Sequence, residues 1–70
     1  MLKINGIYKH YKTDNNYKAL NIGRDTETLE VMVIYQECYG FGDIWIRPLK
    51  MFMEILPDGI PRFGFIEVDI

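Results

Sequence analysis

Hydrophobic and polar residues alternate along most of the chain with the two-residue period of β-strands. This pattern covers residues 6–12, 17–22, 30–37, 44–47 and about 62–68, with polar, glycine-containing or proline-containing connections between them. The apolar register of residues 17–22 slips between Ala19 and Leu20, which predicts either a β-bulge or a strand shared by two layers. Apolar residues occupy both faces of residues 30–37, so we expect this strand to be central in its sheet.

The segment between the last two strands has a different pattern. Residues 49–56 follow Pro48 and fit both a helix and a strand, so we expect one short helical turn and then a strand. Five to six short strands with tight loops and one helical turn are typical of an all-β fold. We therefore predict a small closed SH3-like barrel, with residues 1–70 forming a single domain.

The same alternation assigns the side chains of the first strand to faces. Tyr8, His10 and Lys12 share one face of residues 6–12, and Tyr11 lies on the other. The first face carries a phenol, an imidazole and an ammonium group, which together suit a recognition surface. We expect Tyr11 to contribute to the core instead.

In residues 44–47, the alternation predicts that Ile44 and Ile46 point inward and that Trp45 and Arg47 share the opposite face. A guanidinium group and an indole side by side can stack on each other or bracket a planar ligand. A structural role for Arg47, on an aromatic ring or paired with a carboxylate, fits the pattern equally well.

The size and composition of the chain limit how it can be stabilised. A chain of 70 residues with a net charge of −2 buries a small core, and such domains commonly gain stability from disulfides, metals or self-association. Cys38 has no partner for an internal disulfide, and no metal-binding or dinucleotide-binding motif occurs. We therefore expect a homo-oligomer that uses no cofactor.

The lone thiol of Cys38 is also typical of a reducing compartment. No signal-peptide pattern is present, and no apolar run approaches the ~20 residues that span a bilayer. These features predict a soluble, cytoplasmic protein without a membrane partner.

The charges are distributed unevenly. Residues 1–24 contain five basic residues and one acidic residue, whereas residues 25–70 contain three basic and nine acidic residues. Overall acidity disfavours non-specific nucleic-acid binding, which depends on a positive field, and it therefore disfavours an RNA-binding barrel. The basic residues that lie among tyrosines could still hold a small anion.

Several motifs occur in a fixed order: Gly6-x-Tyr8-x-His10-Tyr11-Lys12, Thr26-Glu27-Thr28, Trp45-Ile46-Arg47-Pro48-Leu49-x-Met51-Phe52 and Pro61-Arg62-Phe63. In these motifs the chain resembles a family of short prokaryotic single-domain proteins of unknown function. That family typically has Ala-Arg-His before its Thr-Glu-Thr motif, whereas this chain has Gly23-Arg24-Asp25 and lacks the second histidine. The resemblance implies a small single domain and brings no established activity.

The preferred functional hypothesis is a non-enzymatic binding protein for a small, planar, anionic ligand such as a nucleotide. The candidate ligand-binding residues are aromatic, basic or hydroxyl-bearing, with one acidic side chain: Tyr8, His10, Arg24, Thr26, Glu27, Thr28, Trp45 and Arg47. Trp45 or Tyr8 would stack on the base, the two arginines would meet the phosphate, and Thr26, Glu27 and Thr28 would hold hydroxyl groups. If the gene belongs to a phage, such a protein could sequester a nucleotide signal.

Other functions are compatible with the same residues. A protein-interaction adaptor would bind a peptide in an aromatic groove of the barrel. Residues 26–28 also fit a plain turn. Catalysis by Cys38 and His10 is not expected, because nothing in the sequence places them together and no third residue is set to orient the histidine.

Overall fold

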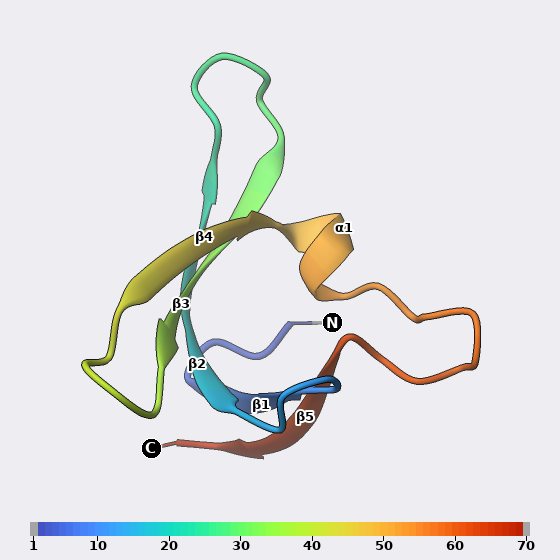
Figure 1. The fold of residues 1–70 in the computed structure, drawn as a ribbon. Helices are drawn as coiled ribbons and strands as arrows, with labels where there is room; N and C mark the ends of the chain where they lie inside the picture. The colour runs from blue at the N-terminus through green and yellow to red at the C-terminus, as the bar shows by residue number, and fades with distance from the viewer. Residues whose placement is uncertain (1, 70) are drawn as a thin grey trace.

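The computed structural model describes residues 2–69, which contain five β-strands and one short helix (Figure 1). The elements are β1 Gly6–His10, β2 Asn16–Arg24, β3 Val31–Glu37, β4 Ile44–Pro48, α1 Leu49–Phe52 and β5 Phe63–Val68. All neighbouring strands are antiparallel, in the order β4-β3-β2-β1-β5. The predicted all-β class and the short helical turn are confirmed. The sheet is not closed by hydrogen bonds, however, and β4 and β5 remain its two edges.

Aromatic packing, rather than backbone pairing, spans the opening of the sheet. Figure 1 shows the sheet curling round, with β4 and α1 on one side and β1 and β5 on the other. Phe52 of α1 stacks on Phe63 of β5, with ring centroids 4.1 Å apart and planes 5° from parallel. Tyr8 and Tyr35 each meet Phe52 edge-on at 5.2 Å. These contacts hold the last part of the chain against the concave face of the sheet.

The predicted bulge in β2 is confirmed. The pairing of β2 with β3 shifts register between Ala19 and Asn21. A bulge inserts one extra residue and so shifts the alternation of side chains between the two faces. Ala19 before the bulge and Ile22 after it therefore both face the concave side. The strand β3 is internal, as expected, since it pairs with β2 on one side and β4 on the other.

The predicted core role of Tyr11 is wrong. Tyr11 is 43% exposed, whereas Tyr8 is only 2% exposed and lies in the core. The hydroxyl group of Tyr8 accepts a hydrogen bond from the backbone N–H of Lys3 at 2.9 Å, which satisfies its polar end. Alternation places the two tyrosines on opposite faces but cannot say which face is buried.

The predicted orientation of β4 is also wrong. Ile44 and Ile46 are 59% and 64% exposed, so they point outward. Trp45 and Arg47 lie on the concave side, opposite Tyr35 and Val33 in the ladder. The strand is an edge, and its polar and amphipathic residues face the inside of the curl.

Side chains and backbone close the turn between β2 and β3. The carboxylate of Asp25 accepts hydrogen bonds from the backbone N–H groups of Glu27 and Thr28 at 2.8 and 3.1 Å. These two bonds lower the pKa of Asp25. Leu29 follows with a φ of 63°, although its side chain is 64% exposed. The left-handed conformation costs a residue with a Cβ atom about 1–2 kcal/mol, and little burial offsets that cost here.

We expect Leu29→Gly to raise the free energy of unfolding by about 1 kcal/mol, because glycine adopts positive φ without a steric penalty. Chemical denaturation followed by circular dichroism measures the change. Leu29→Ala is the control, since it removes the same exposed side chain but keeps the Cβ atom. A glycine variant that is no more stable than the alanine variant would contradict the proposed strain.

Candidate functional site

A hollow of about 260 Å³ opens on the concave side of the sheet, and we call it the aromatic pocket. Its lining combines five aromatic with four polar or charged side chains. The aromatic residues are Tyr17, Tyr35, Tyr39, Trp45 and Phe63, and the others are His10, Thr13, Glu37 and Arg47.

The pairing of β3 with β4 builds one wall of the aromatic pocket. Tyr35 lies opposite Trp45, and Val33 lies opposite Arg47. Trp45 and Arg47 are two residues apart on one strand, so both point to the same side. The indole of Trp45 therefore lies next to the guanidinium group in the wall of a curved sheet.

Phe63 forms the opposite wall and contacts both basic side chains. The guanidinium carbon of Arg47 lies 5.5 Å from the centroid of the Phe63 ring, within the ~6 Å range of a cation–π contact. The imidazole of His10 meets the same ring edge-on at 4.9 Å. Arg47 forms no salt bridge with any other residue in the range 2–69. Its positive charge is therefore available to a ligand.

Glu37 organises the other end of the aromatic pocket. Its carboxylate accepts a hydrogen bond from the indole Nε1–H of Trp45 at 2.8 Å and one from the backbone N–H of Asp43 at 3.2 Å. The hydroxyl group of Tyr39 lies 3.5 Å from the same carboxylate and 2.8 Å from the hydroxyl group of Tyr17. Burial and the bond to Tyr39 raise the pKa of Tyr17 to about 12, so it remains a neutral phenol.

His10 is a neutral donor in this setting. Burial lowers its pKa below 6.5, and the positive charges of Arg47, Arg62 and Lys12 lower it further. Its Nδ1 atom accepts a hydrogen bond from the backbone N–H of Lys12 at 3.2 Å, which leaves the proton of the neutral ring on Nε2. Because the folded state holds this proton less tightly than the unfolded state, His10 destabilises the fold as the pH falls below 6.5.

Replacing Arg47 with glutamine should raise the pKa of His10, because it removes the positive charge that lowers this pKa most. The titration of the His10 ring protons by NMR measures this value directly, and His10 is the only histidine in the chain. Arg24→Gln is the matched control, since Arg24 ends β2 outside the aromatic pocket and its replacement should leave the titration unchanged. Equal shifts in the two variants would contradict the placement of Arg47 beside His10.

The structure separates the other predicted ligand-binding residues from the aromatic pocket. Arg24, Thr26 and Glu27 line a second hollow beside the outward-facing residues of β3 and β4. The guanidinium group of Arg24 donates to the carbonyl of Leu29 at 2.8 Å, and Thr28 accepts a hydrogen bond from the N–H of Glu30 at 3.2 Å. Their hairpin projects from the rest of the molecule at the top of Figure 1.

These contacts support the turn interpretation of residues 26–28. Tyr8 is buried in the core, which removes it from a ligand-contacting role. Of the predicted candidates, the structure brings His10, Trp45 and Arg47 together in the aromatic pocket.

The prediction from sequence missed six residues that line the pocket: Thr13, Tyr17, Tyr35, Glu37, Tyr39 and Phe63. The alternation of Tyr35 and Glu37 on one strand was a usable signal. The contact of Tyr35 and Glu37 with Trp45 depends on the register between β3 and β4. The contact of Phe63 with Arg47 depends on the curl of the sheet.

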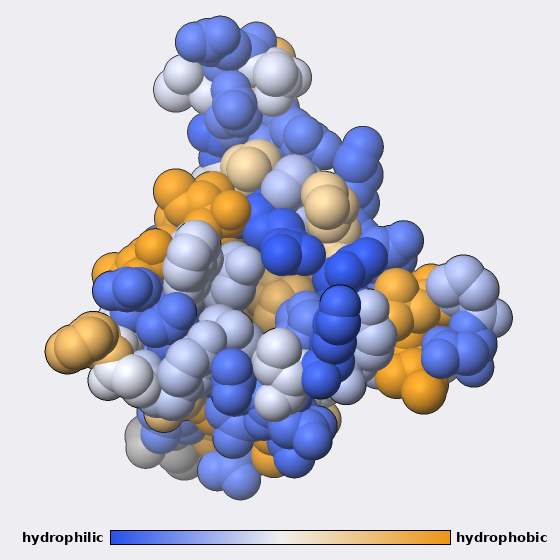
Figure 2. Space-filling model, in the orientation of Figure 1, coloured by the Kyte–Doolittle hydropathy of each residue, from blue (hydrophilic) through white to orange (hydrophobic). Residues whose placement is uncertain are grey.

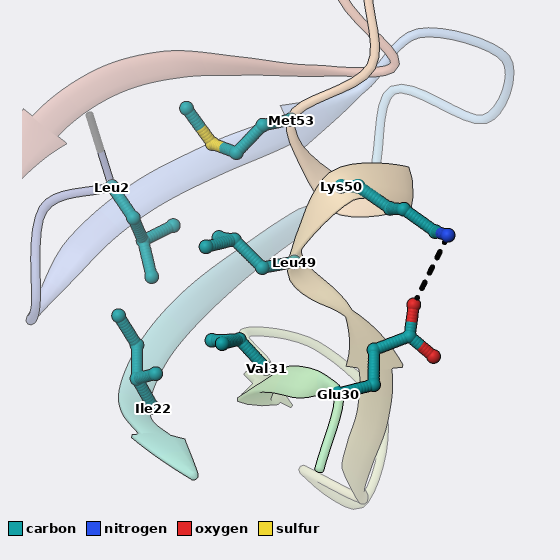
Figure 3. A pocket seen from close by; sticks show the side chains of 7 residues that line it. All are labelled: Leu2, Ile22, Glu30, Val31, Leu49, Lys50 and Met53. Carbon is teal, nitrogen blue, oxygen red and sulfur yellow. Dashed lines mark ion pairs between the residues drawn. The ribbon is translucent and has the colours of Figure 1, made fainter. Parts of the chain in front are cut away.

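A larger groove of about 730 Å³ lies beside α1 and shares no lining residue with the aromatic pocket, and we call it the apolar groove (Figure 3). Leu2, Ile22, Val31, Leu49 and Met53 point into it. At its rim, Lys50 forms a salt bridge with Glu30 at 3.3 Å. This lining suits an apolar side chain better than a charged planar molecule.

Residues 2–69 contain no group of three side chains placed to hold a metal ion. No helix within residues 2–69 is long and apolar enough to cross a bilayer. Burial and the charge of Asp69 raise the pKa of the Cys38 thiol, which weakens it as a nucleophile at neutral pH.

Residues 6–65 match the family described as "Protein of unknown function (DUF1653)". The chain belongs to this family. A crystal structure of a DUF1653 protein from Bordetella bronchiseptica has the same fold, with a TM-score of 0.76 and 33% sequence identity over 93% of this chain and 88% of that chain. No curated protein matches the sequence. The family description names no activity.

Proposed function

We propose that this DUF1653 protein is a non-enzymatic binding protein for a small planar anion, of the size of a mononucleotide, held in the aromatic pocket. The observation that carries the proposal is the guanidinium group of Arg47, which lies on Phe63 beside Trp45 without a salt bridge to any residue in the range 2–69. An available planar cation suits a phosphate or carboxylate, and the aromatic faces suit a flat ring.

The carboxylate of Glu37 and the guanidinium group of Arg47 together set the orientation of the ligand in the aromatic pocket. The backbone N–H of Glu37 donates to the carbonyl of Asp43, four residues before Arg47 on the facing segment. Glu37 and Arg47 are therefore roughly 13 Å apart along the strands, at a rise of about 3.3 Å per residue. A molecule with an anionic group at one end and an N–H donor at the other would satisfy both side chains. A nucleoside monophosphate with an amino-substituted base has this pattern.

The size of the aromatic pocket also limits the ligand. Its volume of about 260 Å³ is smaller than the roughly 300–1,000 Å³ typical of pockets for drug-sized molecules. This favours a single nucleotide or base over a dinucleotide. Trp45 is half-exposed, so one face of its indole is open for stacking.

A ligand of this class should raise the melting temperature of the protein, because it binds the folded state alone. A thermal-shift panel of mononucleotides, nucleosides and inorganic phosphate measures the effect. Arg47→Ala should abolish the shift. Arg24→Ala, which removes an arginine of the β2–β3 hairpin instead, should retain it. A shift that survives Arg47→Ala, or the absence of any shift with the wild-type protein, would contradict the proposal.

Binding of a mononucleotide should tighten as the pH falls from neutrality toward the lowered pKa of His10, because a bound anion favours the protonated form of His10 and raises its pKa. Calorimetric titrations at about pH 7.5 and pH 5.5 should differ several-fold in affinity. His10→Gln is the matched control, since it keeps an N–H donor but cannot take up the proton. An equal pH dependence in this variant would assign the effect to another group, the phosphate of the ligand included.

The apolar groove supports a second candidate function, that of a protein-interaction adaptor. Its five apolar side chains could receive an apolar residue of a peptide, and the Lys50–Glu30 pair at its rim could meet polar groups beside it. Met53→Glu would then abolish peptide binding but leave the mononucleotide shift intact.

A further inference from the structure

The edge strand β4 exposes three consecutive apolar residues. Ile44, Trp45 and Ile46 are 59%, 50% and 64% exposed. Figure 2 shows apolar side chains gathered on the side of the molecule where β4 lies in Figure 1. Edge strands normally carry charges, prolines or bulges that block pairing with another chain. In β4 the charged residue and the proline, Arg47 and Pro48, both lie at its C-terminal end.

The ladder with β3 shows which backbone groups of β4 are free. The N–H of Glu37 donates to the carbonyl of Asp43 at 3.0 Å, so these two residues form a hydrogen-bonded pair. Hydrogen-bonded and non-hydrogen-bonded pairs alternate in an antiparallel ladder. Trp45 and Arg47 therefore direct their backbone groups to β3. Ile44 and Ile46 direct theirs to the open edge.

We propose that two copies of this chain pair through β4, antiparallel, with Trp45 opposite the partner's Trp45. In this register Ile44 lies opposite the partner's Ile46, and each such pair exchanges both of its backbone hydrogen bonds. The outward-facing isoleucines of the two copies then cover each other on the convex side. The pairing is isologous, so it closes a two-fold dimer and leaves no β4 edge free.

Charge complementarity selects this register. It places Asp43 opposite the partner's Arg47, on the concave side, and the two-fold axis repeats the pair. Asp43 is exposed, and neither its carboxylate nor the guanidinium group of Arg47 forms a salt bridge within residues 2–69. A guanidinium group has five N–H donors, so a pair with the partner's Asp43 leaves donors of Arg47 for a ligand. Centring the pairing on Ile46 instead would place Pro48, which has no N–H, opposite Ile44 and would separate the charges.

The other edge of the sheet is less suited to self-pairing. Glu67 is the charged residue of β5, and Asp69 after it already forms a salt bridge with Lys18 at 3.2 Å. Two copies of β5 would therefore match no basic side chain of one strand with an acidic side chain of the other. The β4 pairing instead matches opposite charges and apolar side chains in one register. It also brings together the two pocket walls that contain Trp45, so the aromatic pockets of the two subunits would open beside each other.

Sedimentation equilibrium of the full chain, with native mass spectrometry, tests this dimer. The wild-type protein should be a dimer at micromolar concentrations. Ile46→Glu should make it monomeric, whereas Ile55→Glu should not, since Ile55 is equally exposed but lies outside β4. A wild-type monomer over the whole concentration range, or equal loss of the dimer in both variants, would overturn the proposal.

A charge exchange tests the register. Asp43→Arg and Arg47→Asp should each weaken the dimer about tenfold or more, because each turns two attractive pairs into repulsive ones. The double variant should recover to within about threefold of wild type, since it restores both pairs in reverse. Failure to recover, with circular dichroism showing folded protein, would contradict the register. The double variant has no arginine at position 47, so it should form dimers without binding mononucleotides. Dimer formation and mononucleotide binding are therefore tested separately by this variant.

Discussion

The contact between Phe52 and Phe63 determines the shape of this protein. The sheet is left open between β4 and β5, so no strand pairing joins these two edges. The stacked rings, 4.1 Å apart, join the helical turn that follows β4 to the start of β5 and so hold the two edges near each other. In a domain of 70 residues with a small core, such a contact forms a large part of the packing.

The same contact supplies the candidate site. Phe63 packs on Phe52 and also receives the guanidinium group of Arg47 and the edge of His10. The core therefore positions one wall of the aromatic pocket, and the β3–β4 ladder positions the other. A cation at one end and the Glu37 carboxylate at the other give this pocket a polarity, while the lowered pKa of His10 keeps a neutral donor between charged groups.

Much of the fold could be predicted from the sequence because strand alternation is a local property. The β2 bulge at Ala19, the helical turn after Pro48 and the shared face of Trp45 and Arg47 all follow from short-range patterns. The errors over Tyr11 and over the isoleucines of β4 have one cause. A period of two separates the faces of a strand, and only the curl of the sheet decides which face is inside.

The central claim is that the aromatic pocket, supported by Phe63, binds a small planar anion. The most direct measurement is an NMR titration of the protein with mononucleotides, following the indole N–H of Trp45 and the ring protons of His10. The account predicts that both move together and saturate at one affinity. Saturable shifts confined to residues of the apolar groove, such as Leu2 and Met53, or no saturable shift at all, would contradict it.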